Sequence, residues 1–122
     1  MSGIATIEAN VRRRGPDGAW GDLEVRVGSD LVLRESEFPL GQLANGLESW
    51  AASVTDQTPN TYILTVPNRP DLLGAFRIEP RPAGWQFTSV RELARHAPIS
   101  LETWLESIDA FRRRLASDVP AA

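Results

Sequence analysis

The sequence predicts an α+β fold in a single domain spanning residues 1–122, with one antiparallel sheet of about six strands and two helices on one face. Three observations lead to this class. Several short segments alternate apolar and polar residues, two longer segments carry apolar residues three and four positions apart, and no repeat or linker divides the chain. The predicted order of elements is βββ-α-βββ-α. With 42% hydrophobic and 24% charged residues, the composition is that of an ordinary globular domain.

Three strands in a meander are expected first. Residues 7–12, 22–27 and 31–35 change between apolar and polar at nearly every step, which is typical of strands with one buried face. In the second of them, alternate residues from Leu23 to Val27 face the core, and those from Asp22 to Arg26 face outward. The segments 15–18 and 28–30 contain the glycines and aspartates of tight turns.

A helix is predicted to follow. Pro39 fits its first turn, where the missing N–H costs nothing. Gly46 inside the helix is unfavourable by about 1 kcal/mol relative to Ala, so it either permits close packing or marks a weak point. The helix has an apolar stripe of Leu40, Leu43, Ala44, Leu47, Trp50, Ala51 and Val54.

Three further strands are expected over residues 61–66, 73–79 and 85–90, separated by a proline-rich loop at 67–71 and a turn at 80–84. Residues 91–98 are ambiguous between a helical turn and an irregular crossing segment. The last helix is the clearest element, with Ser100 as N-cap and Glu102 in the first turn. Its apolar stripe runs from Leu101 to Leu115, and residues 117–122 are expected to form a short frayed tail.

Residue types absent from the chain exclude several kinds of chemistry. Without cysteine there is no disulfide, thiolate zinc site or thiol nucleophile, and without lysine there is no phosphate-binding loop of the usual kind. The one histidine, His96, lies in the ambiguous segment, where a structural role is favoured over that of a general base. We therefore expect no catalytic residue, no metal, no cofactor and no enzymatic activity. An enzyme that uses His96 with a nearby carboxylate stays as a lesser alternative.

Charge and hydropathy set expectations about partners and location. The net charge is -3, so the chain as a whole is not drawn to nucleic acid or to anionic membranes. Two arginine triplets, at residues 12–14 and 112–114, would form an anion-binding patch if they met in space, although charged ends that only keep the elements soluble are more usual. No signal peptide and no apolar run of roughly 20 residues is present. We expect a cytoplasmic protein without membrane contact.

The candidate binding residues lie on the predicted outer face of the sheet and in the first turn region. A flat, charged sheet face is suited to docking, although it can also be simply solvated. Trp20 is either an exposed anchor for a partner or a cap on the edge of the core, whereas Trp50, Trp85 and Trp104 are expected to be core residues. The predicted partner-binding set is Trp20, Asp22, Glu24, Arg26, Arg34, Arg77 and Glu79. Glu8, Gln86 and Thr88 are expected on the same outer face.

Several segments resemble a known group of proteins. These are residues 20–27, Phe38-Pro39-Leu40 at the entry to a leucine-rich helix with Trp50, and residues 84–87 before an amphipathic C-terminal helix. They resemble the small actinobacterial α+β proteins encoded beside polymorphic toxins, the immunity proteins. The resemblance implies tight binding to a cognate toxin, usually over its active site. It carries over no functional residue, because the matching positions are turn, cap and core residues.

The sequence therefore predicts a non-enzymatic protein-binding module, most concretely an immunity-type inhibitor of a bacterial toxin. The alternative is a small structural or assembly protein that self-associates, as a homodimer for example, through an exposed strand edge.

Overall fold

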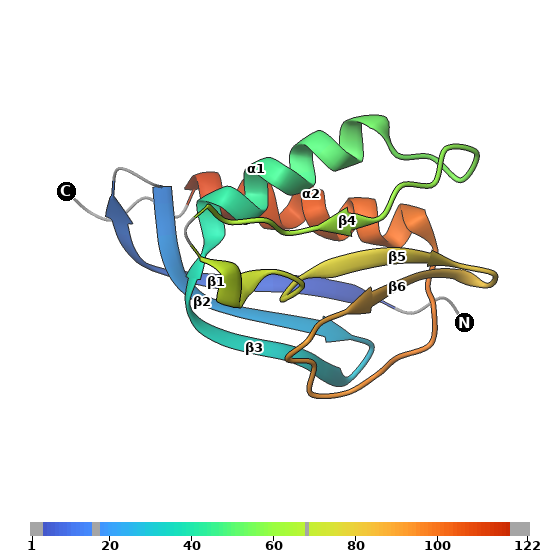
Figure 1. The fold of residues 1–122 in the computed structure, drawn as a ribbon, viewed down its shortest axis with the longest axis horizontal. Helices are drawn as coiled ribbons and strands as arrows, with labels where there is room; N and C mark the ends of the chain where they lie inside the picture. The colour runs from blue at the N-terminus through green and yellow to red at the C-terminus, as the bar shows by residue number, and fades with distance from the viewer. Residues whose placement is uncertain (1–3, 16–17, 68, 118–122) are drawn as a thin grey trace.

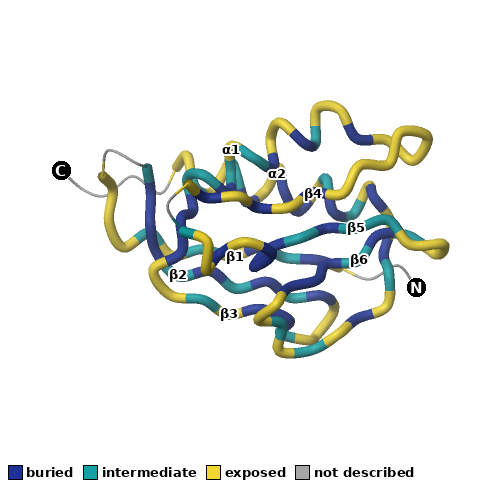
Figure 2. Tube along the Cα trace, in the orientation of Figure 1, coloured by how far each residue is buried: buried dark blue, intermediate teal, exposed yellow. Residues whose placement is uncertain are grey.

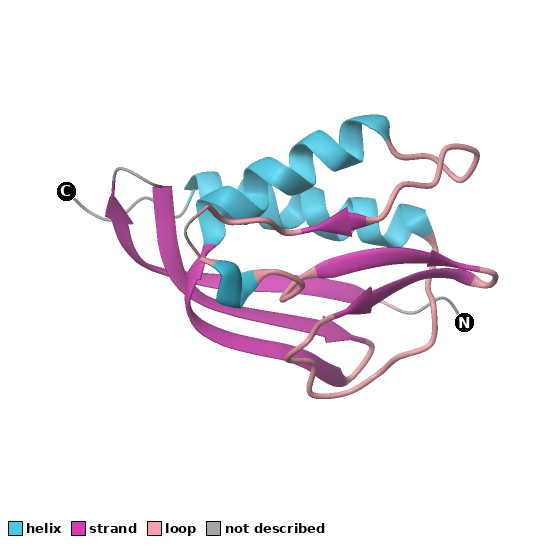
Figure 3. Ribbon diagram, in the orientation of Figure 1, coloured by secondary structure: helices cyan, strands magenta, loops and turns pink. Residues whose placement is uncertain are grey.

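The computed structural model describes residues 4–15, 18–67 and 69–117 (Figure 1). These residues form two helices and six strands, which confirms the α+β class (Figure 3). The elements in chain order are β1 (Ala5–Gly15), β2 (Gly18–Val27), β3 (Asp30–Pro39), α1 (Leu40–Ser53), β4 (Tyr62–Ile63), the 3-10 turn η1 (Pro70–Leu72), β5 (Arg77–Arg81), β6 (Gly84–Thr88) and α2 (Leu101–Ser117).

The six strands form two sheets, so the expected single sheet is wrong. One antiparallel sheet has the order β1-β2-β3 and the other β4-β5-β6. Apolar alternation predicts which face of a strand is buried, but it does not specify the neighbouring strand. Here the free edge of β6 pairs with the segment before α2, since Trp85 and Ile99 exchange backbone hydrogen bonds of 2.7 and 2.9 Å. The irregular segment after β6 is joined to β3 by a backbone bond from the N–H of Leu93 to the carbonyl of Val32 at 2.8 Å.

The first sheet contains a bulge near its outer end. The β1–β2 register shifts between Val11 and Arg13. Nearby, a Cβ on Gly21 would lie 2.0 Å from the carbonyl oxygen of Asn10, so only glycine lets the two backbones approach this closely. Gly28, with φ of 62°, forms the expected tight turn between β2 and β3.

The core lies between the helices and the sheets (Figure 2). α1 packs on β2 and α2 packs on β1, and the helices also contact each other. The aromatic rings connect all layers: Trp50 of α1 meets Trp85 of β6 edge-on, and Phe87 of β6 lies against Trp104 of α2. All three tryptophans are buried, as the sequence predicts. Among the described residues, no helix has the length and apolar character needed to cross a membrane.

The helices begin where the sequence indicates. α1 starts directly after Pro39. The hydroxyl of Ser100 accepts the backbone N–H of Thr103 at 3.1 Å, which confirms the predicted cap of α2. Gly46 permits close packing, because Tyr62 of β4 occupies the space that a Cβ would need. Ser117 is the last residue of α2, and the rest of the expected tail lies outside the described residues.

The second half of the chain is less regular than expected. β4 contains only two residues, and the strand expected from residue 73 begins at Arg77, after η1 and Gly74, whose φ is 77°. A left-handed residue interrupts an extended strand, which explains the late start. Residues 91–98 form no helix and cross irregularly from β6 to α2.

Candidate protein-binding surface

The outer face of the first sheet is an exposed field of paired charges. Inward-facing residues such as Val25 and Leu33 are fully buried, whereas Glu8 and Arg34 on the opposite face are exposed. The register places Glu24 between Glu8 of β1 and Arg34 of β3. The helices pack against the buried face, so side chains of the outer face are directed away from them.

Glu24 lies at the centre of this face and is held by two arginines. Its Oε2 accepts the Nε of Arg34 at 2.9 Å, and its Oε1 accepts Nη2 of Arg26 at 3.3 Å. The hydrogen bond from Arg34 holds the pKa of Glu24 below its usual range, with a smaller effect from Arg26. The three side chains fix one another's positions on an otherwise solvated surface.

A second ion pair extends the face toward the outer end of the sheet. Arg12 of β1 donates through Nε at 2.9 Å and Nη2 at 2.7 Å to the same oxygen of Asp22 in β2. The hydrogen bond to this carboxylate raises the pKa of Arg12 above its ordinary value. We call the set Asp22, Glu24, Arg26 and Arg34, with Arg12 and Glu8, the charged face.

Two shallow hollows lie on the charged face, and carboxylates form much of their lining. The larger, of about 480 Å³, runs between β2 and β3, and the smaller, of about 220 Å³, runs between β1 and β2. Asp22 and Glu24 border both hollows, so a group docked in either one meets these two carboxylates. The larger is lined by Asp22, Leu23, Glu24, Arg34, Glu35 and Ser36, and the smaller by Glu8, Ala9, Asn10, Asp22 and Glu24.

Arg77 and Glu79 are not part of this face, because they belong to β5 of the second sheet. Glu79 accepts Arg81 at 2.6 Å and lies 3.8 Å from Arg77, so it forms a separate cluster. The Nε of Arg77 is buried without a hydrogen-bond partner. The predicted site is thus divided between two sheets, for the same reason that the single sheet was wrong.

Trp20 is a buried part of the core edge and not an exposed anchor. It lies in β2 opposite Pro39, with 8% of its surface accessible. The guanidinium of Arg13 lies 4.8 Å from the centre of its ring, and that of Arg69 lies 6.0 Å away. Of the two interpretations given by the sequence, the cap on the core edge agrees with this placement.

His96 is buried, and both of its ring nitrogens contact the backbone. Nε2 accepts the N–H of Phe87 at 3.1 Å, and Nδ1 lies 2.6 Å from the carbonyl of Ala97, to which it donates in the matching tautomer. The ring also lies against Trp104. These contacts give His96 a structural role, because its ring joins the irregular segment to the backbone of β6. No group of three or more possible metal ligands occurs within residues 4–15, 18–67 and 69–117.

The first arginine triplet ends beside the last turns of α2, which carry the second, since Nη2 of Arg14 donates to the carbonyl of Leu115 at 3.1 Å. Their charge is largely compensated by the protein's own carboxylates. Besides the Arg12–Asp22 pair, Arg13 contacts Glu37 at 3.3 Å. In the second triplet, Arg112 contacts Glu48 at 2.7 Å and Arg113 contacts Asp109 at 2.8 Å.

Sequence reasoning did not find an apolar patch made by two loops. Leu73, Val90 and Leu93 are 58%, 66% and 60% exposed, and the N–H of Val90 bonds to the carbonyl of Gly74 at 3.1 Å. Arg91, between two of these residues, forms a 2.5 Å ion pair with Glu35 of β3. Leu73 and Val90 were expected at the ends of the strands 73–79 and 85–90, and only Leu93 lies in the segment that the sequence leaves ambiguous.

No protein-family model matches the chain, and neither the curated proteins nor the solved structures contain a significant match.

Proposed function

We propose that this protein is a non-enzymatic binding module that docks one partner protein on the charged face. The observation that carries the proposal is the Arg26–Glu24–Arg34 cluster, whose side chains hold one another on an exposed sheet surface between two hollows. Side chains already ordered before binding lose less entropy on association.

The charges supply selectivity more than stability. Arg34 is 62% exposed and Arg12 60% exposed, and solvent screens ion pairs at such positions, so they contribute little to folding. Across an interface, the same charges steer the encounter and fix the orientation of the partner. The partner that fits presents basic groups to the carboxylates in the hollows and acidic groups to Arg26 and Arg34.

The partner class that we propose is a bacterial toxin, with this protein as its immunity-type inhibitor. The support for that class is the resemblance of residues 20–27, 38–40 and 84–87 to immunity proteins. An inhibitor of this kind works in the cytoplasm and needs no catalytic group of its own.

The proposal is tested by titration calorimetry against the purified protein encoded by the neighbouring reading frame. We expect a one-to-one complex at micromolar concentration or below, and loss of the partner's toxicity when both are expressed together. Arg34→Glu should weaken binding by at least about tenfold, because it places a carboxylate beside Glu24. Arg113→Glu is the matched control, since Arg113 is also exposed and paired with one carboxylate, but lies on α2.

Absence of binding heat at micromolar concentration would overturn the toxin-inhibitor assignment. Equal affinity of Arg34→Glu and the wild-type protein would overturn the charged face as the docking surface.

A further inference from the structure

The outer edge of β1 carries backbone groups that no other strand pairs with in the described part of the chain. The carbonyl of Ile4 accepts the N–H of Gly28 at 2.6 Å, so the even-numbered residues of this strand hydrogen-bond toward β2. By antiparallel alternation, the odd-numbered residues direct their N–H and C=O groups outward. The carbonyl of Ala5 agrees with this, because it lies 2.6 Å from the hydroxyl of Ser107 in α2.

The free part of the edge has two defined ends. At one end, the hydroxyl of Ser107 donates a hydrogen bond to the carbonyl of Ala5. At the other end, the bulge after Val11 ends the regular strand. Between them lie the outward backbone groups of Ile7, Ala9 and Val11, for which the described residues supply no hydrogen-bond partner outside the β1–β2 pairing. An unpaired edge of this kind is a template for another strand.

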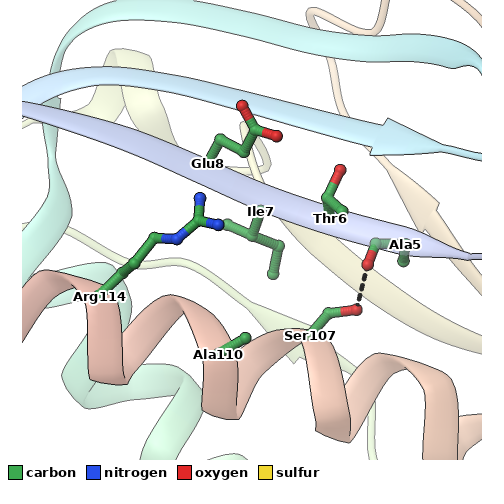
Figure 4. A pocket seen from close by; sticks show the side chains of 7 residues that line it. All are labelled: Ala5, Thr6, Ile7, Glu8, Ser107, Ala110 and Arg114. Atoms are coloured by element: carbon green, nitrogen blue, oxygen red, sulfur yellow. Dashed lines mark hydrogen bonds between the residues drawn. The ribbon is translucent and has the colours of Figure 1, made fainter.

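A groove runs beside this edge, between β1 and α2. Figure 4 shows its first part, where Ala110 and Ser107 of α2 face Ala5 and Ile7 of β1. It continues as a hollow of about 300 Å³ that is lined by Ala9, Phe111, Arg114, Leu115 and Ser117. Ala9 and Leu115 are only partly buried, so added atoms would cover apolar surface there. Arg114 is the longest side chain over the groove and is exposed, so it can swing outward.

We propose that β1 of a second copy of this chain binds this edge in antiparallel orientation, on a two-fold axis through Ala9. The free segment from Ile7 to Val11 is centred on that residue, so the two-fold arrangement uses all of its outward groups. Ile7 then lies opposite Val11 of the partner subunit, and about six backbone hydrogen bonds join the copies. The pairing joins the β1-β2-β3 sheets of the two copies into one continuous sheet, with the two charged faces on the same side of it.

The charges of β1 favour a second copy as the occupant. Glu8 is exposed and has no ion-pair partner within residues 4–15, 18–67 and 69–117, although it lies directly opposite Glu24. In the proposed register, Glu8 lies opposite Asn10 of the partner subunit. Its two diagonal neighbours are Glu8 and Arg12 of the partner subunit, so each arginine supplies a positive charge beside the pair of carboxylates, within reach of long side chains. Arg12, now bound to Asp22, then bridges two carboxylates.

Alternative registers are less favourable. A shift of the two-fold axis to Glu8 places two copies of that carboxylate directly opposite each other, which is repulsive. A shift toward Asn10 extends the pairing into the bulge between Val11 and Arg13, where the ladder is interrupted. The dimer uses Glu8 and Arg12 at the border of the charged face and leaves the Arg26–Glu24–Arg34 cluster open, so this inference does not rest on the proposed function.

Sedimentation velocity of the full chain over a range of micromolar concentrations tests the proposal. We expect the wild-type protein to be a dimer. Ala9→Pro removes an edge-directed N–H without touching the β1–β2 ladder and should give a monomer, because proline is tolerated at such edge positions. Glu8→Arg should also give a monomer, since it leaves only positive charges at the two diagonal positions, Arg12 of the partner subunit and the substituted residue 8 of the partner subunit. Asp109→Arg makes the same charge change on an exposed position of α2 and should stay dimeric.

Circular dichroism and thermal melting of each variant distinguish a loss of pairing from a loss of fold. A wild-type protein that is monomeric at every concentration would overturn the proposal. A dimer that persists in folded Glu8→Arg or Ala9→Pro would show that the copies associate elsewhere.

Discussion

Gly46→Ala offers a sharp test of how α1 packs on the second sheet. A Cβ at this position would lie 2.7 Å from the hydroxyl oxygen of Tyr62 and 3.2 and 3.3 Å from its ring. The tyrosine cannot easily move aside, because it is 7% exposed and packs between Trp50 and Phe76. Burial also raises the pKa of its hydroxyl. The substitution therefore sets helix propensity against a steric clash.

The two effects have known sizes. Alanine stabilises a helix interior by about 1 kcal/mol relative to glycine. Overpacking a well-packed site costs about 1–3 kcal/mol. The net change in the free energy of unfolding should therefore lie between no change and a loss of about 2 kcal/mol. In a Tyr62→Phe background the closest contact disappears, and the same substitution should be neutral or stabilising.

Urea unfolding followed by tryptophan fluorescence measures both effects in a double-mutant cycle. We expect a coupling energy between the two substitutions of about 1 kcal/mol or more. Ser49→Ala, at an exposed position of α1, gives the helix-propensity gain without a clash. The reasoning is refuted if Gly46→Ala has the same effect with Tyr62 and with phenylalanine at that position.

Three further predictions concern single side chains. The pKa of Glu24 is lowered from 4.5 in the folded protein, so the ionised carboxylate stabilises the fold above pH 4.5, and this contribution is lost as the pH falls through the lowered pKa. In unfolding curves measured between pH 7 and pH 3, Glu24→Gln should lack this loss of stability. Glu37 has a φ of 54°, a left-handed conformation that costs most residues about 1–2 kcal/mol and that asparagine tolerates better. Glu37→Asn should therefore raise the melting temperature, although it removes the exposed ion pair with Arg13. Glu37→Gln removes the same ion pair without relieving the strain and should not raise it. His96→Ala should lower the free energy of unfolding by about 2–4 kcal/mol, because it leaves the N–H of Phe87 without its acceptor and opens a cavity; a loss under about 1 kcal/mol in urea titration would contradict the structural role.

Elements defined by local chemistry were predicted well from the sequence. The turn at Gly28 and the cap at Ser100 depend on backbone preferences and hydrogen bonds within a few residues. Both helices and their buried tryptophans followed from periodicity alone. The division into two sheets could not be predicted in this way, because apolar alternation within a strand does not specify which strands pair with each other.

The candidate site shows the same distinction. Asp22, Glu24, Arg26 and Arg34 were placed on one outer face by alternation along neighbouring strands, and they meet there in ion pairs. Arg77 was assigned to that face only because one sheet was assumed. Trp20 was misjudged as a turn residue, although its strand extends to Gly18 and arginines cover its ring.

The bond between Ser107 and Ala5 joins residues 102 positions apart, and it connects the first strand to the last helix. During synthesis, α1 follows the β1–β3 meander directly and can cover β2, whereas β1 gains its covering helix only when α2 has been made. Contacts of such long sequence separation form slowly, and apolar surface that they cover in the native state stays exposed until they form. We therefore expect the order of folding events to be set by the arrival of α2, and the early meander to be the species most in need of protection from aggregation.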